Sequence, residues 1–305
     1  MHHSSRRNRP AGRAVALGSL GLVVAAAACG GGGSPSATTN RSTATAAPVQ
    51  TFPGPAGLTA AAQPQPDGYM WLLARPPTGA NLQLLNLTTG KIYQVVPASA
   101  ASVAVTQSPS GLVGVGLASG ATGALELRNG SSGVPVATVP VGAPVKGVYA
   151  GTDGTTFYVL NGTAASASVT LVNSQTDKAS VSVPVPLDTV SVVVDPAGQN
   201  LFALGSNGTV DQIGIGSGAV TASFRVGPNP VQLAVSSSGS TLYVLKSTAS
   251  GADVGVVDIA TESQTRALPA PANSVGLQPS ADGRSLYLVV GTSQIGNIQE
   301  FSLPS

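Results

Sequence analysis

Residues 231–259 read VQLAVSSSGSTLYVLKSTASGADVGVVDI, and they contain one complete repeating unit of the chain. An apolar run at 233–235 is followed by a Ser-Ser-Gly turn at 237–239, a second run covers 242–245, and a third covers 254–259 after a polar loop. Short apolar runs separated by Gly and Ser turns are typical of antiparallel strands with tight connections. We therefore expect consecutive β-strands here and in every other copy of the unit.

The unit recurs at a nearly constant interval. A turn glycine preceded by a small or acidic residue lies 41 to 44 residues from the next one, at Gly68, Gly111, Gly154, Gly198, Gly239 and Gly283. The residue four positions after each glycine is apolar and should be buried in a second strand: Leu72, Val115, Tyr158, Phe202, Tyr243 and Tyr287. A later turn starts at Asn86, Asn129, Asn173, Gly216 and Asp258. Asn and Asp suit such turns because their side chains can hydrogen-bond to the backbone of the turn itself.

A period of about 43 residues with four short strands per unit is the signature of a β-propeller blade. Three segments, 158–161 (Tyr-Val-Leu-Asn), 243–246 (Tyr-Val-Leu-Lys) and 258–261 (Asp-Ile-Ala-Thr), carry a more specific likeness. They resemble the YVTN-type β-propeller repeats of surface-layer-like proteins, and the resemblance covers residues 49–305. It implies the strand packing of a propeller, and it implies no particular activity.

The two ends of the repeat array complement each other. The last copy stops where its fourth strand should begin, whereas an extra strand-like piece at 49–53 precedes the first copy. We predict that residues 49–53 pair beside residues 298–303. That pairing closes an all-β, six-bladed β-propeller of four-stranded antiparallel blades and removes the open edges of the array.

The N-terminus has the composition of an export signal. Four arginines precede the apolar run 14–28, which is too short to span a bilayer but fits a secretory signal. The run ends at Cys29, the only cysteine, and residues 26–29 (Ala-Ala-Ala-Cys) resemble the lipobox of bacterial lipoproteins, in which the cysteine is diacylated. The resemblance implies a lipoprotein signal peptide over 1–28, lipidation of Cys29 and anchoring to the extracytoplasmic face of the cell membrane. The alternative is an ordinary secretory signal with an unmodified Cys29.

The segment after Cys29 separates the signal from the repeats. Residues 30–48 contain no large apolar side chain, so they cannot bury enough surface to offset the entropy cost of ordering them. We expect residues 29–48 to form a flexible acylated tether and residues 49–305 to form the β-propeller domain.

Charge and residue usage exclude several function classes. Four of the 14 basic residues lie in the signal, whereas all 12 acidic residues follow Cys29, so the remainder is weakly acidic and unsuited to nucleic acid. His2 and His3 are the only histidines, and both precede Cys29. The mature chain therefore cannot build a His-dependent base, a Ser-His-Asp or Cys-His site, or a zinc site of His and Cys. We predict no metal site and no cofactor.

Several polar residues fit turn positions. Asp67, Asp153 and Asp282 precede turn glycines, and we expect them to cap those turns. Four Asn-x-Ser/Thr sequences, at Asn86, Asn129, Asn161 and Asn207, are also interpreted as turns.

A ligand would bind, on this interpretation, to the loops between second and third strands together with the connections between blades. The polar candidates for ligand binding on these loops are Arg75, Asp188, Lys246 and Asp253, with solvated loop residues as the alternative. Trp71, the only tryptophan, is expected to pack within the propeller rather than to stack on a ligand.

Two function classes remain open. The favoured one is a monomeric, non-enzymatic binding or scaffold module of the cell envelope, attached to the membrane through its lipid anchor, with an envelope protein or a glycan as partner. The alternative is a propeller hydrolase or lactonase-like enzyme that uses carboxylates and Lys or Arg in the central channel. At least three converging charged residues would favour the enzyme, and a face of small neutral residues would favour the binding module.

Overall fold

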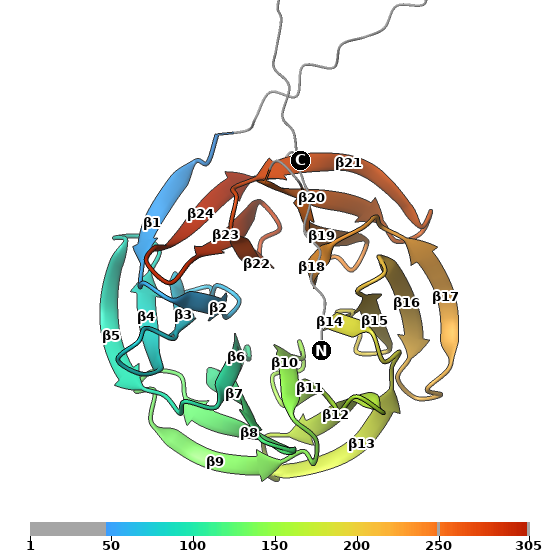
Figure 1. The fold of residues 1–305 in the computed structure, drawn as a ribbon, viewed down its shortest axis with the longest axis horizontal. Helices are drawn as coiled ribbons and strands as arrows, with labels where there is room; N and C mark the ends of the chain where they lie inside the picture. The colour runs from blue at the N-terminus through green and yellow to red at the C-terminus, as the bar shows by residue number, and fades with distance from the viewer. Residues whose placement is uncertain (1–46, 249–250, 304–305) are drawn as a thin grey trace, which may run out of the picture. The chain divides into compact units, whose positions relative to one another are not determined.

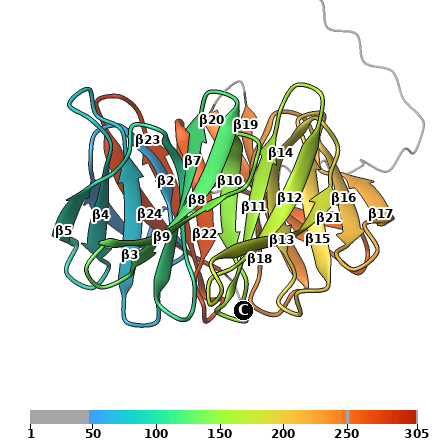
Figure 2. The same cartoon turned by 90° about the horizontal axis from the view of Figure 1, so that it is seen from below.

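The computed structural model describes residues 47–248 and 251–303, which form 24 β-strands in six sheets of four strands each (Figure 1). Each sheet is one blade, and its strands run antiparallel between two ends where the loops gather (Figure 2). The predicted six-bladed β-propeller is therefore confirmed. The predicted signal peptide, Cys29 and most of the predicted tether lie outside the described residues.

In chain order, each blade begins with its innermost strand and moves outward. Blades 1 and 2 comprise β2 (Leu58–Ala61), β3 (Tyr69–Ala74), β4 (Asn81–Asn86), β5 (Lys91–Pro97), β6 (Ser102–Gln107), β7 (Leu112–Ser119), β8 (Thr122–Asn129) and β9 (Pro135–Pro140). Blades 3 and 4 comprise β10 (Val145–Ala150), β11 (Thr156–Gly162), β12 (Ala167–Asn173), β13 (Lys178–Pro184), β14 (Thr189–Val194), β15 (Asn200–Gly205), β16 (Thr209–Gly214) and β17 (Val220–Arg225). Blades 5 and 6 comprise β18 (Pro230–Val235), β19 (Thr241–Thr248), β20 (Gly251–Asp258), β21 (Ser263–Ala270), β22 (Ser274–Pro279), β23 (Ser285–Gly291), β24 (Gly296–Ser302) and, at the outer edge, β1 (Gln50–Gly54).

The turn between the first and second strands is built in the same way in every blade. The six predicted glycines have φ between 68° and 85°, a left-handed conformation that glycine adopts without steric cost. Each glycine N–H donates to the carbonyl three residues earlier, as Gly239 does to Ser236 at 2.9 Å. Asp67, Asp153 and Asp282 accept backbone N–H groups of these turns, so the predicted capping is confirmed.

The turn between the third and fourth strands also follows the prediction. Asn86, Asn129, Asn173 and Asp258 each accept at least one backbone N–H through the side-chain Oδ1. These contacts stop the third strand at a defined residue and return the chain as the outermost strand.

The core consists of six apolar clusters, one between each pair of neighbouring blades. The six apolar residues predicted for the second strands all lie in the core, none of them more than 9% exposed. Trp71 in β3 is fully buried, and its Nε1–H donates to the Gly130 carbonyl of blade 2 at 2.9 Å. Its predicted packing role is confirmed.

Strand β1 closes the ring as predicted. It pairs antiparallel with β24, with Gln50 opposite Glu300 and Phe52 opposite Ile298. Figure 1 shows β1, the bluest strand, beside the red strands of the last blade. Phe52 is 1% exposed within the cluster that joins blades 6 and 1. The N-terminal strand thus supplies both ladder hydrogen bonds and apolar burial to the last blade.

Two local expectations were wrong. Asn161 is not a turn residue, because β11 continues to Gly162 and buries it at 1% exposure. Lys246 and Asp253 are not loop residues, because β19 and β20 form a long hairpin in which they lie directly opposite each other. In both places the strands extend further than the polar sequence indicates, because the polar side chains find hydrogen-bond or charge partners in the folded chain.

Candidate functional site

A ring of six side chains lines the axis of the propeller. In every innermost strand the register with the second strand slips by one residue near the start, as at Val145/Gly147 and Thr189/Ser191. Such an extra residue bulges out of the ladder and re-aims its side chain. The six bulge residues all line the same axial cavity: Thr59, Val103, Lys146, Val190, Val231 and Val275.

The cavity has a volume of about 480 Å³ and extends along the innermost strands. That volume lies in the range typical of small-molecule pockets. At the end away from the bulge residues, its walls include residues of the turns that follow the innermost strands: Pro66, Pro109, Thr152, Pro196, Ser237 and Ala281. None of the described residues of the loops between second and third strands contributes to the lining. The bulge residues lie at the same end of the propeller as those loops, because the start of each innermost strand pairs with the end of the second strand. The cavity therefore lies on the axis, inside the ring of loops that the sequence pattern favoured, and is lined by other residues.

Side chains fasten the innermost strands to one another around this cavity. The Ser191 Oγ accepts the Leu233 N–H at 3.1 Å, and the Gln232 Oε1 accepts the Leu277 N–H at 2.9 Å. The Gln278 Nε2 donates to the Ala61 carbonyl at 2.9 Å and so links blade 6 to blade 1. Each bond crosses between blades, so the wall is held by neutral groups.

Tyr149 belongs to the same set of contacts. Its hydroxyl lies 3.2 Å from Ser191 Oγ and accepts the Val192 N–H at 3.4 Å. Burial raises the pKa of Tyr149, and the hydrogen bonds with Ser191 and Val192 oppose that shift only in part. The phenol therefore stays protonated at neutral pH and acts as a fixed polar link between blades 3 and 4.

Among the described residues, Lys146 is the only charged one in the cavity lining. Sequence reasoning missed it, although a signal was present. In five blades the bulge residue lies eight positions before the turn glycine, and in the first blade it lies nine before. Aligning the repeats on the glycine places Lys146 in a column otherwise filled by four valines and Ala60.

The predicted loop candidates Arg75 and Asp188 do not converge. Arg75 follows β3, is exposed, and donates through Nη2 to the Ala100 carbonyl at 2.9 Å. Asp188 lies between β13 and β14, where its carbonyl accepts the Ser206 N–H at 2.9 Å. Neither lines the axial cavity.

Lys246 and Asp253 lie close together, on the hairpin of β19 and β20 in blade 5. Lys246 is 8% exposed, and its Nζ lies 3.2 Å from Asp253 Oδ1 and 3.0 Å from Gln264 Oε1. The charge of each residue is balanced by the other across the β19–β20 pair. Their geometry is that of a cross-strand ion pair within the blade, and neither residue lines the cavity.

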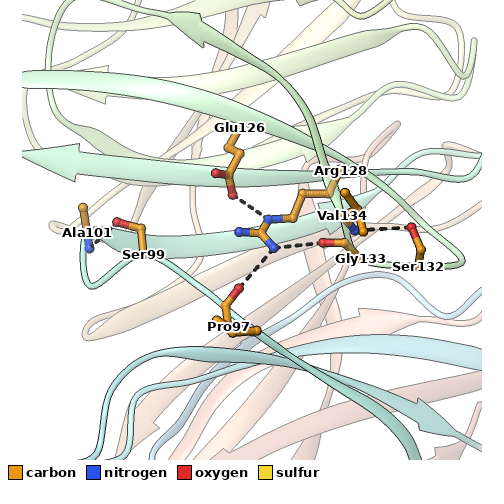
Figure 3. Close-up of polar contacts among 8 residues, drawn as sticks. All are labelled: Pro97, Ser99, Ala101, Glu126, Arg128, Ser132, Gly133 and Val134. Atoms are coloured by element: carbon orange, nitrogen blue, oxygen red, sulfur yellow. Dashed lines mark hydrogen bonds and ion pairs between the residues drawn. The ribbon is translucent and has the colours of Figure 1, made fainter.

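Arg128 and Glu126 form a second ion pair, which sequence reasoning did not single out (Figure 3). The Arg128 Nε donates to Glu126, while its Nη1 donates to the Gly133 carbonyl at 2.9 Å and to the Pro97 carbonyl at 3.2 Å. The sequence contained a signal for this pair: Glu126 and Arg128 are two residues apart in an otherwise apolar strand, and residues two apart in a strand share a face. Since Pro97 ends β5, this arginine ties blade 1 to blade 2.

The part of the chain that the structure describes offers no set of metal ligands. Residues 47–248 and 251–303 contain no group of three or more His, Cys, Asp or Glu side chains close enough to hold an ion. The same residues contain no helix of the length and hydropathy needed to cross a membrane.

Comparisons with known proteins support the fold alone. No family model and no curated protein sequence matches the chain. Among solved structures it is similar to Kuenenia stuttgartiensis hydrazine synthase, with a TM-score of 0.61 and 16% sequence identity over 76% of this chain and 73% of that one. At this identity the likeness shows a shared chain fold, and it transfers no activity.

Proposed function

We propose that this protein is a lipid-anchored lipoprotein of the cell envelope whose β-propeller is a non-enzymatic binding module. The observation that carries the binding role is the axial cavity of about 480 Å³, whose walls hold many small neutral side chains and one charge. The export signal and the Cys29 motif support the location. From the sequence, we expect a protein or glycan partner. Because of the cavity volume, we expect the bound part to be a ligand or segment small enough to enter the cavity.

The composition of the lining favours binding over hydrolysis. At least three converging charged residues would favour the hydrolase. The described lining holds one charged residue, Lys146, and no carboxylate. A pocket with one charge among apolar and amide groups can orient a ligand and exclude water, which is sufficient for recognition.

The binding role can be tested by identifying the compounds that co-purify with the protein from cell-envelope extracts. The full-length protein and a Val190→Trp variant, which places a large ring in the cavity, would be purified and their bound small molecules identified by mass spectrometry. Val220→Trp on the exposed outer strand β17 is the matched control, because Val220 is 56% exposed and does not line the cavity. We expect a compound that accompanies the wild type and the control but not Val190→Trp. Equal recovery from all three proteins contradicts the proposal, and conversion of that compound during incubation supports the hydrolase.

Membrane attachment is tested separately. Two acyl chains give stable attachment whereas one binds only reversibly. Cys29→Ser should move the protein from the membrane fraction to the soluble fraction of disrupted cells, while Val220→Trp should stay with the membranes. Identical distribution of Cys29→Ser and wild type would show that Cys29 carries no anchor.

A further inference from the structure

We infer that the axial cavity binds an amphiphilic monoanion, a small apolar molecule with one carboxylate, and that Lys146 pairs with its charge. This inference rests on the proposed binding role of the cavity and adds the chemical class of the ligand.

Lys146 lies in a ring of otherwise uncharged side chains around the axis. Lys146 occupies the bulge of β10, and the equivalent bulges of the five other blades carry Thr59, Val103, Val190, Val231 and Val275. Since all six residues line the cavity, one ammonium group shares a ring with four valines and a threonine. The side chain is exposed, so its amine is accessible to a solute that enters the cavity.

Lys146 brings a positive charge to the lining of the cavity. Within the described residues no ion pair and no side-chain hydrogen bond involves Lys146, whereas Lys246 is paired with Asp253 and Arg128 with Glu126. No described Asp or Glu lines the cavity, so no carboxylate of the described wall neutralises the amine. A carboxylate would form a charge-assisted hydrogen bond with Lys146 in surroundings that are less polar than water. One positive charge matches one negative charge, which favours a monoanion over a polyanion.

Apolar side chains in the same ring as Lys146 would contact the rest of the ligand. Val103, Val190, Val231 and Val275 offer apolar surface at the level of the amine, and the turns at the far end add proline side chains. The Gln232 Oε1 and the Gln278 Nε2 are already engaged between blades. The hydrocarbon part of the ligand meets the ring of valines, where its burial contributes to affinity, while the remaining wall offers polar as well as apolar groups.

Decanoate and 1-decanol form a probe pair with the same ten-carbon chain and a different charge. Their binding to the full-length protein would be measured by calorimetry below the concentration at which decanoate aggregates. The variants are Lys146→Gln and Lys146→Arg in the cavity, with Lys178→Gln on the exposed outer strand β13 as the matched loss of one positive charge.

We expect decanoate to bind the wild type, Lys146→Arg and Lys178→Gln alike, and to bind Lys146→Gln at least about tenfold more weakly, the usual effect of losing a hydrogen bond to a charged group. Decanol should bind all four proteins with similar affinity. Equal affinity of decanoate for Lys146→Gln and wild type overturns the inference but leaves cavity binding in place. If neither probe binds while a compound still accompanies the wild type and not Val190→Trp, the ligand class is wrong and the proposed function stands. If the accompanying compound is also missing, both fail.

Discussion

Asn161 illustrates how a residue can look like a surface turn in sequence and be part of the core. Its Nδ2 donates to the Val141 carbonyl at 2.7 Å and to Thr170 Oγ1 at 3.1 Å, and its Oδ1 accepts the Ser168 hydroxyl at 2.8 Å. The side chain thus connects β12 of its own blade with the chain that follows β9. Buried polar groups are stable only when their hydrogen bonds are made, so this amide is a structural requirement of blade 3.

Replacing Asn161 with Ala should destabilise the propeller by about 2 kcal/mol or more, because several buried groups lose their partner at once. Asn129→Ala is the matched control: the same residue type in the same Asn-x-Ser/Thr pattern, but exposed and capping a turn. We expect a loss of about 1 kcal/mol or less for the control. Urea unfolding of both variants measures the difference, and equal losses would mean that the buried bonds of Asn161 contribute little.

Tyr287 makes the stability of the protein depend on pH in the alkaline range. Burial, followed by the negative charge of Glu300, raises the pKa of Tyr287 to about 12. In the unfolded chain a tyrosine titrates near pH 10, so its stabilising contribution is complete below about pH 10 and is lost as the pH rises to about 12. Burial also raises the pKa of Tyr149, Tyr158 and Tyr243, which adds to the loss in the same direction.

Tyr287→Phe should therefore lose stability less steeply than the wild type between about pH 10 and 12. Tyr93→Phe, which alters a side chain that is 72% exposed, should keep the wild-type slope. Urea midpoints measured at intervals across this range check the prediction. An unchanged slope for Tyr287→Phe would assign the alkaline loss to other groups.

At the scale of elements, strand β1 completes a blade that the C-terminal repeat leaves one strand short. Phe52 faces the interior between blades 6 and 1, packed in one cluster with Met70, Leu85 and Ile298. Val49, which precedes the strand, is 65% exposed and contributes a backbone bond from its N–H to the Glu300 carbonyl at 2.8 Å. A buried and an exposed side chain of the same segment can thus be compared.

Phe52→Ala should lower the free energy of unfolding by about 3 to 5 kcal/mol, the usual cost of emptying a buried phenylalanine site. Val49→Ala keeps the backbone bond and removes only exposed surface, so we expect a change within about 0.5 kcal/mol. Thermal and urea unfolding compare the two. A small effect of Phe52→Ala would mean that β1 is held by backbone pairing alone.

At the scale of the whole propeller, the ring closes through close backbone contact between blades 6 and 1. The Gly57 N–H donates to the Thr292 carbonyl at 2.9 Å, and the Gln278 amide bonds to Ala61. A Cβ added to Gly296 would lie only 1.8 Å from the Pro55 carbonyl oxygen. Gly296 is therefore required for close approach of two chain segments that are far apart in sequence.

Gly296→Ala should destabilise the ring and increase association between molecules, because separating β1 from β24 exposes a strand edge. Gly216→Ala is the matched control, since a Cβ there meets nothing within 4 Å. Size-exclusion profiles and melting curves of the two variants check the expectation. A monomeric Gly296→Ala protein with an unchanged melting temperature would show that the seam tolerates a side chain.

The blade count, the turn positions and the closing strand could be predicted from the sequence because they depend on short-range chemistry repeated six times. A glycine with positive φ leaves the same local pattern in every copy, and an Asn or Asp that caps its own turn recurs in four of them. The apolar residue four positions after the glycine marks the second strand, which is buried along most of its length. The missing fourth strand could be recognised because the other copies supplied the comparison.

The candidate site could not be predicted in the same way. A one-residue slip in each innermost strand directs Lys146 to the axis, and such a slip depends on pairing with the next strand rather than on the residue itself. Likewise, Lys246 and Asp253 become a pair only because β19 and β20 extend far enough to place them opposite each other. The sequence by itself thus determined the repeating blade and its closure, whereas the tertiary structure decided which polar residues meet, because that depends on strand register and on the distance between chain segments.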